Sequence, residues 1–410
     1  MPASETTAVT RRIGAPFLWA SVLLLIYLLL VGVATIGAGF KWVSGGAEGA
    51  AEIFAFASSP VVGVILGTLA TALVQSSSTV TSVIVGLVAG GVPVEVAVPM
   101  IMGANMGTTI TNTIVSLGNL GERQAFRRSF EAATVHDFFN LYSILVFLPL
   151  EATLHPLERS AAWLARGLRG SEDASLTGID LVAAATRPPA ALLVDALHLL
   201  PATAGGLLTI FLGICMVITA VIYLGKQLRR AMTGRARGII DLAIGRGPLN
   251  GIASGTVVTV LVQSSSTTTS LVVPLAGAGV LTTRQIYPFT LGANIGTCVT
   301  ALLAATSISG VNEFFALQIA LVHLLYNLLG VTLFMLVPWL RELPPRSAAW
   351  LGRRVELHRG WALGYLGGVF FVIPGAVFSA QLLFEDTPPA PLCVGPPDRC
   401  AVAAQPAAAS

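Results

Sequence analysis

The sequence predicts an all-α, polytopic membrane protein made of two inverted-topology repeats. Of its 410 residues, 54% are hydrophobic and only 10% are charged, where a soluble domain usually carries roughly 25% charged residues. The mean hydropathy is +0.81, so lipid must surround most of the chain. A ten-residue motif, LVQSSSTxTS, occurs twice, at Leu73–Ser82 and Leu261–Ser270. These observations indicate a duplicated membrane protein.

The apolar runs predict where the chain crosses the membrane, because a spanning helix needs about 20 apolar residues. The first run follows Arg11 and Arg12 and lacks a clear cleavage site, so we expect a retained first helix. Two longer stretches, 59–92 and 249–281, carry QSSST near their middle and are predicted to be re-entrant hairpins. Candidate spans are residues 16–39, 96–117, 130–150, 206–225, 285–307, 313–338 and 361–384.

Arginine positions predict the orientation of these spans. The segments 121–129, 226–247 and 339–360 are rich in Arg, and short Arg-rich loops lie in the cytoplasm. The expected location is the plasma (inner) membrane. The predicted organisation is a cytoplasmic N-terminus (1–15), a first repeat (16–150), an extracytoplasmic connecting segment (151–205), a second repeat (206–338), a cytoplasmic loop (339–360), a final membrane helix (361–384) and an extracytoplasmic tail (385–410).

The repeat extends beyond the ten-residue motif. Residues 63–113 match residues 251–302, including a GANxGT run at Gly103–Thr108 and Gly292–Thr297. A shared HxxxN spacing follows in the next helix of each copy. A unit of helix, hairpin, helix and helix crosses the membrane an odd number of times, so the two copies are predicted to be inverted. Inverted repeats with broken helices are typical of secondary transporters, which bind substrate near the bilayer midplane.

The QSSST runs are the first candidate site. They offer hydroxyls and an amide without formal charge, and a turn at a hairpin tip presents backbone N–H groups that attract anions. The alternative is that Ser and Thr only join packed helices. A nearly verbatim repetition led by Gln favours the binding site.

The GANxGT runs are the second candidate. Thr108 and Thr111 are three residues apart on one helix face, as are Thr297 and Thr300. Hydroxyls and freed carbonyls are suitable ligands for sodium, which is a hard cation. The alternative is that the Gly-xxx-Gly spacing serves close helix packing.

The HxxxN runs are the third candidate. Two roles are open for these side chains: they relay protons, or they hold a hairpin in place by hydrogen bonds. We favour the second, structural role. Asp137 lies at membrane depth, where acidic residues are functional candidates by default. Its counterpart in the second repeat is Leu324, and pairing with a nearby Arg is the alternative. The residues of this group are His136, Asp137, Asn140, His323 and Asn327.

Several motifs of other functions are absent from the sequence. There is no GxxxxGK[ST], no GxSxG, no metal-ligand cluster and no pair of carboxylates. We therefore expect no enzymatic activity and no cofactor other than sodium ions as co-substrate. The net charge of +3 gives no reason to expect a nucleic-acid partner. Cys393 and Cys400 form a disulfide or remain free thiols; the oligomeric state is not indicated.

The paired QSSS motifs, each followed by GANxGT, and the run HDFFN at His136–Asn140 resemble the type II sodium/phosphate cotransporter family. The resemblance covers most of residues 60–340, and the compact length favours a bacterial member. It implies symport of inorganic phosphate with sodium, and it implies that both QSSS stretches line the site. The implied sodium ligands are Gln263, Ser264, Thr297 and Thr300. The GANxGT pattern itself makes Thr108 and Thr111 candidates for a second sodium site. Of the two QSSS stretches that line the site by resemblance, Ser76–Thr79 best match the phosphate contacts, and the other candidate contacts in the stretches are Gln75, Ser265, Ser266 and Thr267. The GANxGT pattern adds Asn105 and Asn294 as candidate substrate contacts.

The expected mechanism is sodium-coupled phosphate uptake by alternating access. Because the binding motifs contain no Arg or Lys, bound sodium would supply the positive charge that phosphate needs. Alternatives are a sodium- or proton-coupled transporter of another oxyanion or small carboxylate, a channel, and a scaffold whose repeats only pack.

Overall fold

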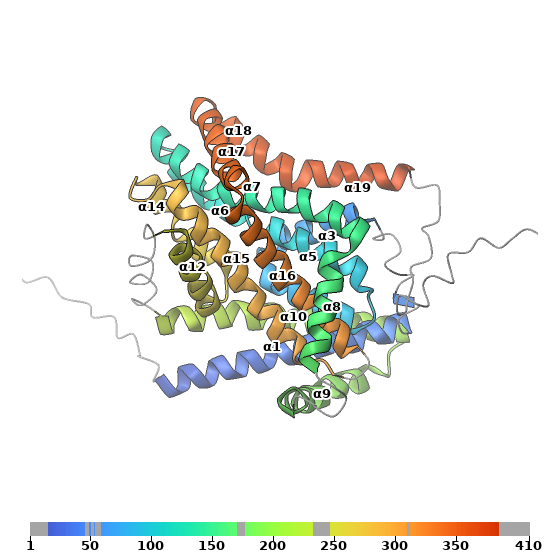
Figure 1. Ribbon diagram of the computed structural model, residues 1–410. Coiled ribbons are helices and arrows are strands. Elements are labelled where there is room, and N and C mark those ends of the chain that lie inside the picture. Colours follow the sequence, from blue (N-terminus) through green and yellow to red (C-terminus); the bar gives the residue numbers. More distant parts are fainter. Residues whose placement is uncertain are drawn as a thin grey trace, which may run out of the picture.

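The structure, a computed structural model, describes residues 15–45, 49–50, 53, 59–169, 177–232, 247–309 and 312–384. Over these ranges its regular elements are all helices, and no strand occurs (Figure 1). Six of the helices are long and apolar enough to cross a membrane: Phe17–Ser44, Arg123–Leu154, Ala202–Leu228, Thr283–Ala305, Glu313–Leu336 and Gly360–Ala380. The predicted class, an all-α polytopic membrane protein, is confirmed. The expected N-terminus and cysteine-containing tail lie outside the described residues.

Most of the helices lie within the two predicted repeats. The first copy contains α1 (Ala15–Ser44), α3 (Pro60–Val74), α4 (Ser77–Ala89), α5 (Val94–Gly107), α6 (Ile110–Ser116), η2 (Leu117–Asn119) and α7 (Arg123–Leu154). The second contains α10 (Ala202–Met232), α12 (Pro248–Val262), α13 (Ser265–Ser270), α14 (Val273–Gly277), α15 (Thr283–Ala305) and α16 (Glu313–Leu336). Helices α8 (Pro156–Arg169) and α9 (Thr177–Leu197) join the copies. The chain ends with α17 (Pro338–Leu357), α18 (Gly360–Gly367), the π-helical turn η3 (Gly368–Val372) and α19 (Ile373–Phe384).

The chain reverses direction at each QSSS motif. In the first copy, Gly63 faces Pro99 and Gly107 faces Thr71, so α3 and α5 run in the same direction. Helix α4, which connects them, must therefore run back. In the second copy, Gly251 faces Pro288 in the same way, and Gly296 faces Thr259. Each motif is thus the tip of a helical hairpin.

Backbone geometry explains the reversal. Gln75 and Gln263 have left-handed backbone conformations, with φ of 58° and 54°. This conformation departs from right-handed helical geometry and therefore ends α3 and α12, and few non-glycine residues adopt it. The next residues, Ser76 and Ser264, are extended and cap α4 and α13. Serine is a preferred N-cap because its hydroxyl accepts a hydrogen bond from a free N–H of the first turn. The QSSS sequence therefore stops one helix and starts another.

Glycines let the hairpin arms approach the following helix. A methyl group on Gly67 or Gly103 would overlap backbone atoms of the facing helix, and the same holds for Gly255 and Gly292. Such backbone contact requires the smallest residue. The GANxGT glycines thus have a packing role, whatever the neighbouring threonines do.

Helices α1 and α10, which precede the first and the second hairpin, run antiparallel. Gly32 lies against Gly213, and Gly39 lies against Thr209. Figure 1 shows the two helices side by side in the lower part of the view, with α9 below them. This pairing is what inverted copies would produce, and the inversion of the complete repeats stays a prediction.

The two hairpins differ in their returning arms. Helix α4 is continuous, whereas the second copy is interrupted between α13 and α14. Pro274 explains the interruption, because proline has no N–H and its ring clashes with the carbonyl of Ser270, four residues earlier. The equivalent position in the first copy is Gly86.

The GANxGT helices differ as well. Helix α5 ends at Gly107 and α6 begins at Ile110, whereas α15 is continuous. At the break, the Thr109 hydroxyl donates to the carbonyl of Met106 over 2.8 Å. A side chain that bonds its own backbone competes with the regular helical pattern.

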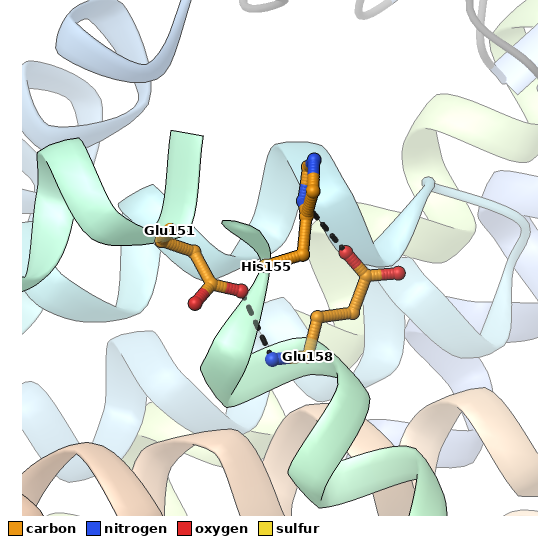
Figure 2. A group of neighbouring side chains, drawn as sticks. All are labelled: Glu151, His155 and Glu158. Atoms are coloured by element: carbon orange, nitrogen blue, oxygen red, sulfur yellow. Dashed lines mark hydrogen bonds and ion pairs between the residues drawn. The ribbon is translucent and has the colours of Figure 1, made fainter. Parts of the chain in front are cut away.

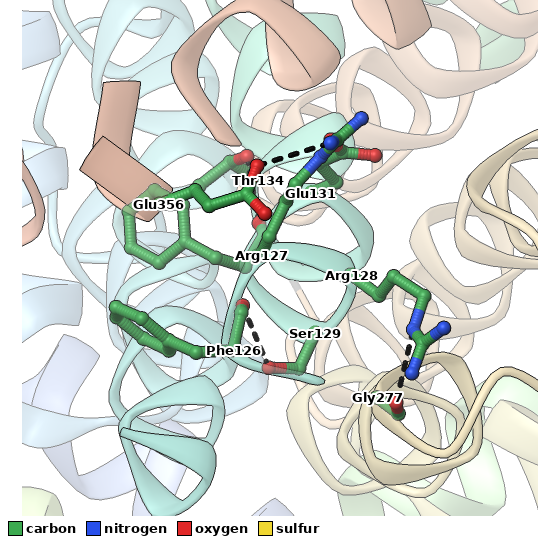
Figure 3. A network of polar contacts seen from close by, with 9 residues as sticks. Phe126, Arg127, Arg128, Ser129, Glu131, Thr134, Gly277 and Glu356 are labelled. Atoms are coloured by element: carbon green, nitrogen blue, oxygen red, sulfur yellow. Dashed lines mark hydrogen bonds and ion pairs between the residues drawn. The ribbon is translucent and has the colours of Figure 1, made fainter. Parts of the chain in front are cut away.

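Two predicted loops are largely helical. The predicted 339–360 loop is helix α17, and α7 begins at Arg123, inside the predicted 121–129 loop. Figure 3 shows how these segments are joined: Arg127 bonds Glu131 over 2.9 Å and Glu356 over 3.0 Å. The Arg128 Nε donates to the Gly277 carbonyl over 3.1 Å. The charged end of α7 therefore contacts both α17 and the end of the second hairpin.

The predicted connecting segment also contains helices, and Figure 2 shows its start. His155 has a φ of 50° and ends α7, and α8 begins directly after it. The buried Glu151 carboxylate accepts hydrogen bonds from the backbone N–H groups of Leu157 (2.8 Å) and Glu158 (2.9 Å). A carboxylate at this place satisfies free N–H groups and favours the helix dipole. Glu151 therefore holds the corner between α7 and α8.

Candidate functional site

Each hairpin tip bonds to the GANxGT helix of its own repeat. The Thr111 hydroxyl donates to Gln75 Oε1 over 2.7 Å, and the Thr300 hydroxyl donates to Gln263 Oε1 over 2.8 Å. The amide Nε2 of each glutamine donates to a carbonyl of its own helix. The two pairs differ in exposure, because Gln263 is only 8% exposed whereas Gln75 is an exposed residue. The second tip is therefore the more enclosed one.

The serines and threonines after each glutamine form the start of a helix. The Thr79 N–H donates to Ser76 Oγ over 3.2 Å, and the Thr267 N–H donates to Ser264 Oγ over the same distance. The next hydroxyl residues of both runs are buried, and these are Ser77, Ser78, Thr79, Ser265 and Ser266. Both runs thus bring hydroxyl groups and first-turn N–H groups together, and neither run contains a basic side chain.

The second hairpin contacts the first repeat. Ser266 Oγ donates to the backbone carbonyl of Thr108 over 3.4 Å. Asn112 Oδ1 accepts from Thr269 over 2.8 Å and from Ser270 over 3.1 Å. The residue equivalent to Asn112 in the second repeat is Ala301, so this contact has no symmetric counterpart. Within the described chain, no hydrogen bond joins the two QSSST runs directly, and their meeting in one site stays a prediction.

The candidate threonines of the GANxGT helices occupy two kinds of position. Thr108 donates to the Ala104 carbonyl and Thr297 to the Ala293 carbonyl, each over 3.0 Å. These hydroxyls use their hydrogen within their own helix, but their oxygen lone pairs can still bind a cation. Thr300 is one turn beyond Thr297 and contacts Gln263. The structure therefore brings Gln263 and Thr300 into direct contact. Ser264 directly follows Gln263 in the chain, and Thr297 is one helical turn before Thr300.

The HxxxN side chains form a crossed network with the motif asparagines. Asn105 donates to Asn327 Oδ1 over 2.8 Å, and its own Oδ1 lies 3.1 Å from His323 Nε2. Asn294 donates to Asn140 Oδ1 over 2.8 Å, and its Oδ1 lies 2.6 Å from His136 Nε2. Each asparagine thus bonds to the histidine and asparagine of the opposite repeat.

This network joins the two repeats in the buried interior. Asn140 also donates to the Asn105 carbonyl over 2.9 Å, which links the two halves of the network. All of its side chains are at most 3% exposed. Both ends of the Asn105 and Asn294 amides are occupied, so the geometry favours a positioning role. Their predicted contact with substrate stays a prediction.

Asp137 is completely buried among hydroxyl groups. Its Oδ2 accepts from Tyr365 over 3.0 Å and from Thr113 over 3.3 Å, and its Oδ1 has no hydrogen-bond partner. No ion pair of Asp137 occurs among the described residues, so they give no support to the alternative of an Arg partner. An uncompensated buried carboxylate is unfavourable. Asp137 is thus a place where a cation or a proton would bind favourably.

Sequence reasoning gave no role to several residues that belong to this region. The hydroxyls of Thr71 and Thr259 are buried without a partner, one turn before each tip glutamine. Their match in the two repeats was the signal that could have found them. Asn112 and Tyr365 gave no comparable signal, because neither has a counterpart of its type in the other repeat and Tyr365 belongs to α18.

The chain is similar to known proteins along most of its length. A family model described as Na+/Pi-cotransporter matches residues 28–152 and 216–342. Sodium-dependent phosphate transport protein 2A of Ovis aries is 33% identical in an alignment 449 positions long, which covers 91% of this chain and 69% of the relative. Sodium-dependent phosphate transport protein 2B of Homo sapiens is 32% identical in an alignment 449 positions long, which covers 87% of this chain and 64% of the relative. No solved structure matches the chain significantly.

Proposed function

The chain belongs to the Na+/Pi-cotransporter family, and from this premise we propose that it takes up inorganic phosphate together with sodium by alternating access. The observation that carries the proposal is the pair of helical hairpins whose QSSST tips bond to GANxGT helices in the same way. Duplicated broken helices of this kind hold substrate and ions in secondary transporters. The proposal includes no catalytic activity and no cofactor beyond sodium ions.

The electrostatics of the tips support coupling. Phosphate loses its hydration when it binds, and hydroxyls with helix N-termini supply only partial charges. A sodium ion nearby would supply a full positive charge without a resident Arg. Each ion then raises the affinity of the other by the same factor, which linkage requires.

We assign the two tips different roles. The second tip would bind sodium through Gln263, Ser264, Thr297 and Thr300, because it is enclosed and offers oxygen ligands. The first tip would bind phosphate through Ser76–Thr79, at the N-terminus of the thirteen-residue helix α4. The more open position of Gln75 favours entry and exit of the substrate there. Thr108 and Thr111 remain candidates for a second sodium ion.

Uptake by proteoliposomes under a sodium gradient tests the substrate. Radiolabelled phosphate is competed with unlabelled phosphate, arsenate, sulfate and small dicarboxylates. We expect phosphate to compete strongly and sulfate and dicarboxylates to compete weakly. If sulfate or a dicarboxylate competed more strongly than phosphate, that anion and not phosphate would be the substrate.

A matched pair of serine variants tests the site. Ser77→Ala removes a buried hydroxyl at the first tip, and Ser129→Ala removes a buried hydroxyl of α7 that bonds only to backbone carbonyls. We expect Ser77→Ala to raise the KM for phosphate and Ser129→Ala to leave it unchanged. Equal effects of the two variants would remove Ser77 from the site.

One observation favours a proton-coupled variant of the same transporter, namely the buried Asp137 carboxylate with a free Oδ1. Uptake is measured at equal pH on both sides and with an imposed pH gradient, at constant sodium. In the proton-coupled variant, the pH gradient alone drives accumulation and Asp137→Asn abolishes that part.

We also place the protein in the plasma (inner) membrane, with a cytoplasmic N-terminus, on the basis of the Arg-rich segments at 121–129, 226–247 and 339–360.

A further inference from the structure

Helix α17 joins two helices that are long and apolar enough to cross the membrane. The first of them ends at Leu336 and the second begins at Gly360, whereas α17 itself is not apolar enough to cross. Both ends of α17 therefore lie at the same boundary of the bilayer. In Figure 1, α17 runs across the direction of α19. Helix α17 thus lies along the membrane surface, and its C-terminal end is at the level of the lipid headgroups.

Two tryptophans mark this end of α17. Trp350 and Trp361 are 47% and 46% exposed, and their ring centroids are 6.4 Å apart. The exposed side chains of Leu357 and Leu363 are close to them in sequence. Tryptophan is enriched where the hydrocarbon core meets the headgroups, because its ring is apolar and its N–H is a hydrogen-bond donor. This composition fits contact with lipid.

The arginines near the two rings make the surface positive. The Arg354 guanidinium lies 5.7 Å from the centroid of the Trp350 ring, where cation and ring attract each other. Within the part of the chain that the structure describes, neither Arg354 nor the exposed Arg359 takes part in an ion pair. The acid between them in sequence, Glu356, is already bonded by Arg127 over 3.0 Å. These two arginines therefore have no acidic partner.

We propose that Trp350, Arg354, Arg359 and Trp361 bind the headgroup of an anionic phospholipid. The guanidinium groups would donate hydrogen bonds to phosphate oxygens, and the indole rings would contact the upper part of the acyl chains. Basic residues next to a membrane span attract anionic lipids. A zwitterionic headgroup brings its own cation and matches the positive surface less well. The inference goes beyond phosphate transport and does not depend on which anion is carried.

Two features favour a lipid over other anions. Inorganic phosphate would make no use of the exposed apolar side chains beside the arginines. A soluble acidic protein would need a surface that projects from the bilayer, whereas this surface is next to Gly360, where the final span begins. The charge and the position together therefore point to a membrane lipid.

Quenching of tryptophan fluorescence by brominated lipids tests the inference. In the full chain the four other tryptophans are changed to Phe, so that Trp350 and Trp361 are the only reporters; these four are Trp19, Trp42, Trp163 and Trp339. Vesicles contain equal amounts of phosphatidylcholine and phosphatidylglycerol, and one lipid or the other carries the bromine. The two quenching levels give the relative binding constant of the lipids at this surface. We expect a preference of roughly tenfold or more for phosphatidylglycerol.

Arginine variants test which side chains cause the preference. One basic residue near an anionic surface changes the affinity roughly fivefold, so Arg354→Gln and Arg359→Gln should each lower the preference by about this factor. The matched control is Arg346→Gln, which removes the same charge from an exposed position of α17 that already lies 3.7 Å from Glu342. The control should keep the preference of the parent within about twofold.

Melting curves of the chain with all its tryptophans, in detergent with either lipid added, supply a second measurement. Phosphatidylglycerol should raise the melting temperature more than phosphatidylcholine in the parent and in Arg346→Gln. This difference should disappear when Arg354→Gln and Arg359→Gln are combined. If the Phe-substituted chain does not fold, these curves decide.

Three results would overturn the inference. Equal quenching by the two lipids in the parent would show that the surface does not select anionic headgroups. An equal loss of preference in Arg346→Gln would show that only the general charge of α17 matters. Absence of quenching by either lipid would place the surface away from the bilayer, where a soluble partner would be its occupant.

Discussion

At the scale of single residues, the glutamine–threonine pairs are the most specific feature of this chain. Sequence repetition alone identified Gln75, Gln263, Thr111 and Thr300 as candidates, because motif and spacing recur. It could not tell that the second pair is enclosed and the first exposed, since the two copies read alike. The surroundings of the two tips also differ: Asn112 of the first repeat bonds Thr269 and Ser270 of the second hairpin, and its counterpart in the second repeat is Ala301.

The enclosed pair leads to a prediction about sodium. Thr300→Val keeps the shape of the side chain, removes the hydroxyl that we propose as a sodium ligand and leaves Gln263 Oε1 without its donor. Loss of one such interaction is worth about 1–2 kcal/mol, so the sodium concentration for half-maximal uptake should rise roughly five- to thirtyfold. Thr290→Val is the matched control, because Thr290 is buried in the same helix and bonds only to the Tyr287 carbonyl. An equal rise in the control would contradict a specific role of Thr300.

A second residue-scale prediction concerns stability and pH. Burial raises the pKa of Glu158, the neighbouring His155 partly opposes this rise, and the charges of Glu95 and Glu151 add to it. Because the folded pKa is raised, the folded state favours the protonated acid, and stability declines as the pH rises through that pKa. Glu158→Gln mimics the protonated form, so its melting temperature should exceed that of the parent at pH 8. The difference should vanish near pH 4.

The control for this prediction is Glu122→Gln, since Glu122 is exposed. The ion pair that Glu158→Gln removes, with His155 at 3.4 Å, is partly exposed and contributes little. A variant that is less stable than the parent at pH 8 would contradict the account.

At the scale of elements, the hairpins could be predicted because QSSST interrupts an apolar stretch of fitting length. Helix α17 could not: its range is rich in Arg and contains Pro344 and Pro345, which indicate a loop. Packing against α7 through the Arg127–Glu356 pair and buried contacts outweighs these local signals. The repeat pattern likewise did not predict the break between α13 and α14, because this break depends on Pro274, where the first copy has Gly86.

Glycine packing gives the prediction for this scale. Gly103→Ala would place a methyl group against the backbone of α3, so the helices must separate and lose contact. We expect a lower melting temperature and poor insertion of the folded protein. Gly118→Ala is the control, because no atom lies near the added methyl group. If both variants were equally stable, close packing of α3 on α5 would not be required.

At the scale of the whole molecule, the crossed histidine–asparagine network joins the repeats. The HxxxN spacing predicted a shared face, but the crossing between repeats is a tertiary feature that sequence spacing does not contain. A double-mutant cycle of His136→Ala and Asn294→Ala should reveal coupling of about 0.6 kcal/mol, the average for hydrogen bonds between membrane helices, and at most about 1.7 kcal/mol. The coupling free energy is obtained from the unfolding free energies of the parent and the variants in detergent. Asn294→Ala combined with Thr209→Ala, which changes a hydroxyl of α10 bonded within its own helix, should be additive.

The central claim is coupling of phosphate movement to sodium. The most direct measurement is radiolabelled phosphate uptake into proteoliposomes of the purified chain, with an inward sodium gradient, with equal sodium on both sides, and with potassium in place of sodium. The account predicts accumulation above the external concentration only under the gradient, equilibration without accumulation at equal sodium, and no uptake in potassium. Uptake in potassium at the same rate as under the sodium gradient would contradict it.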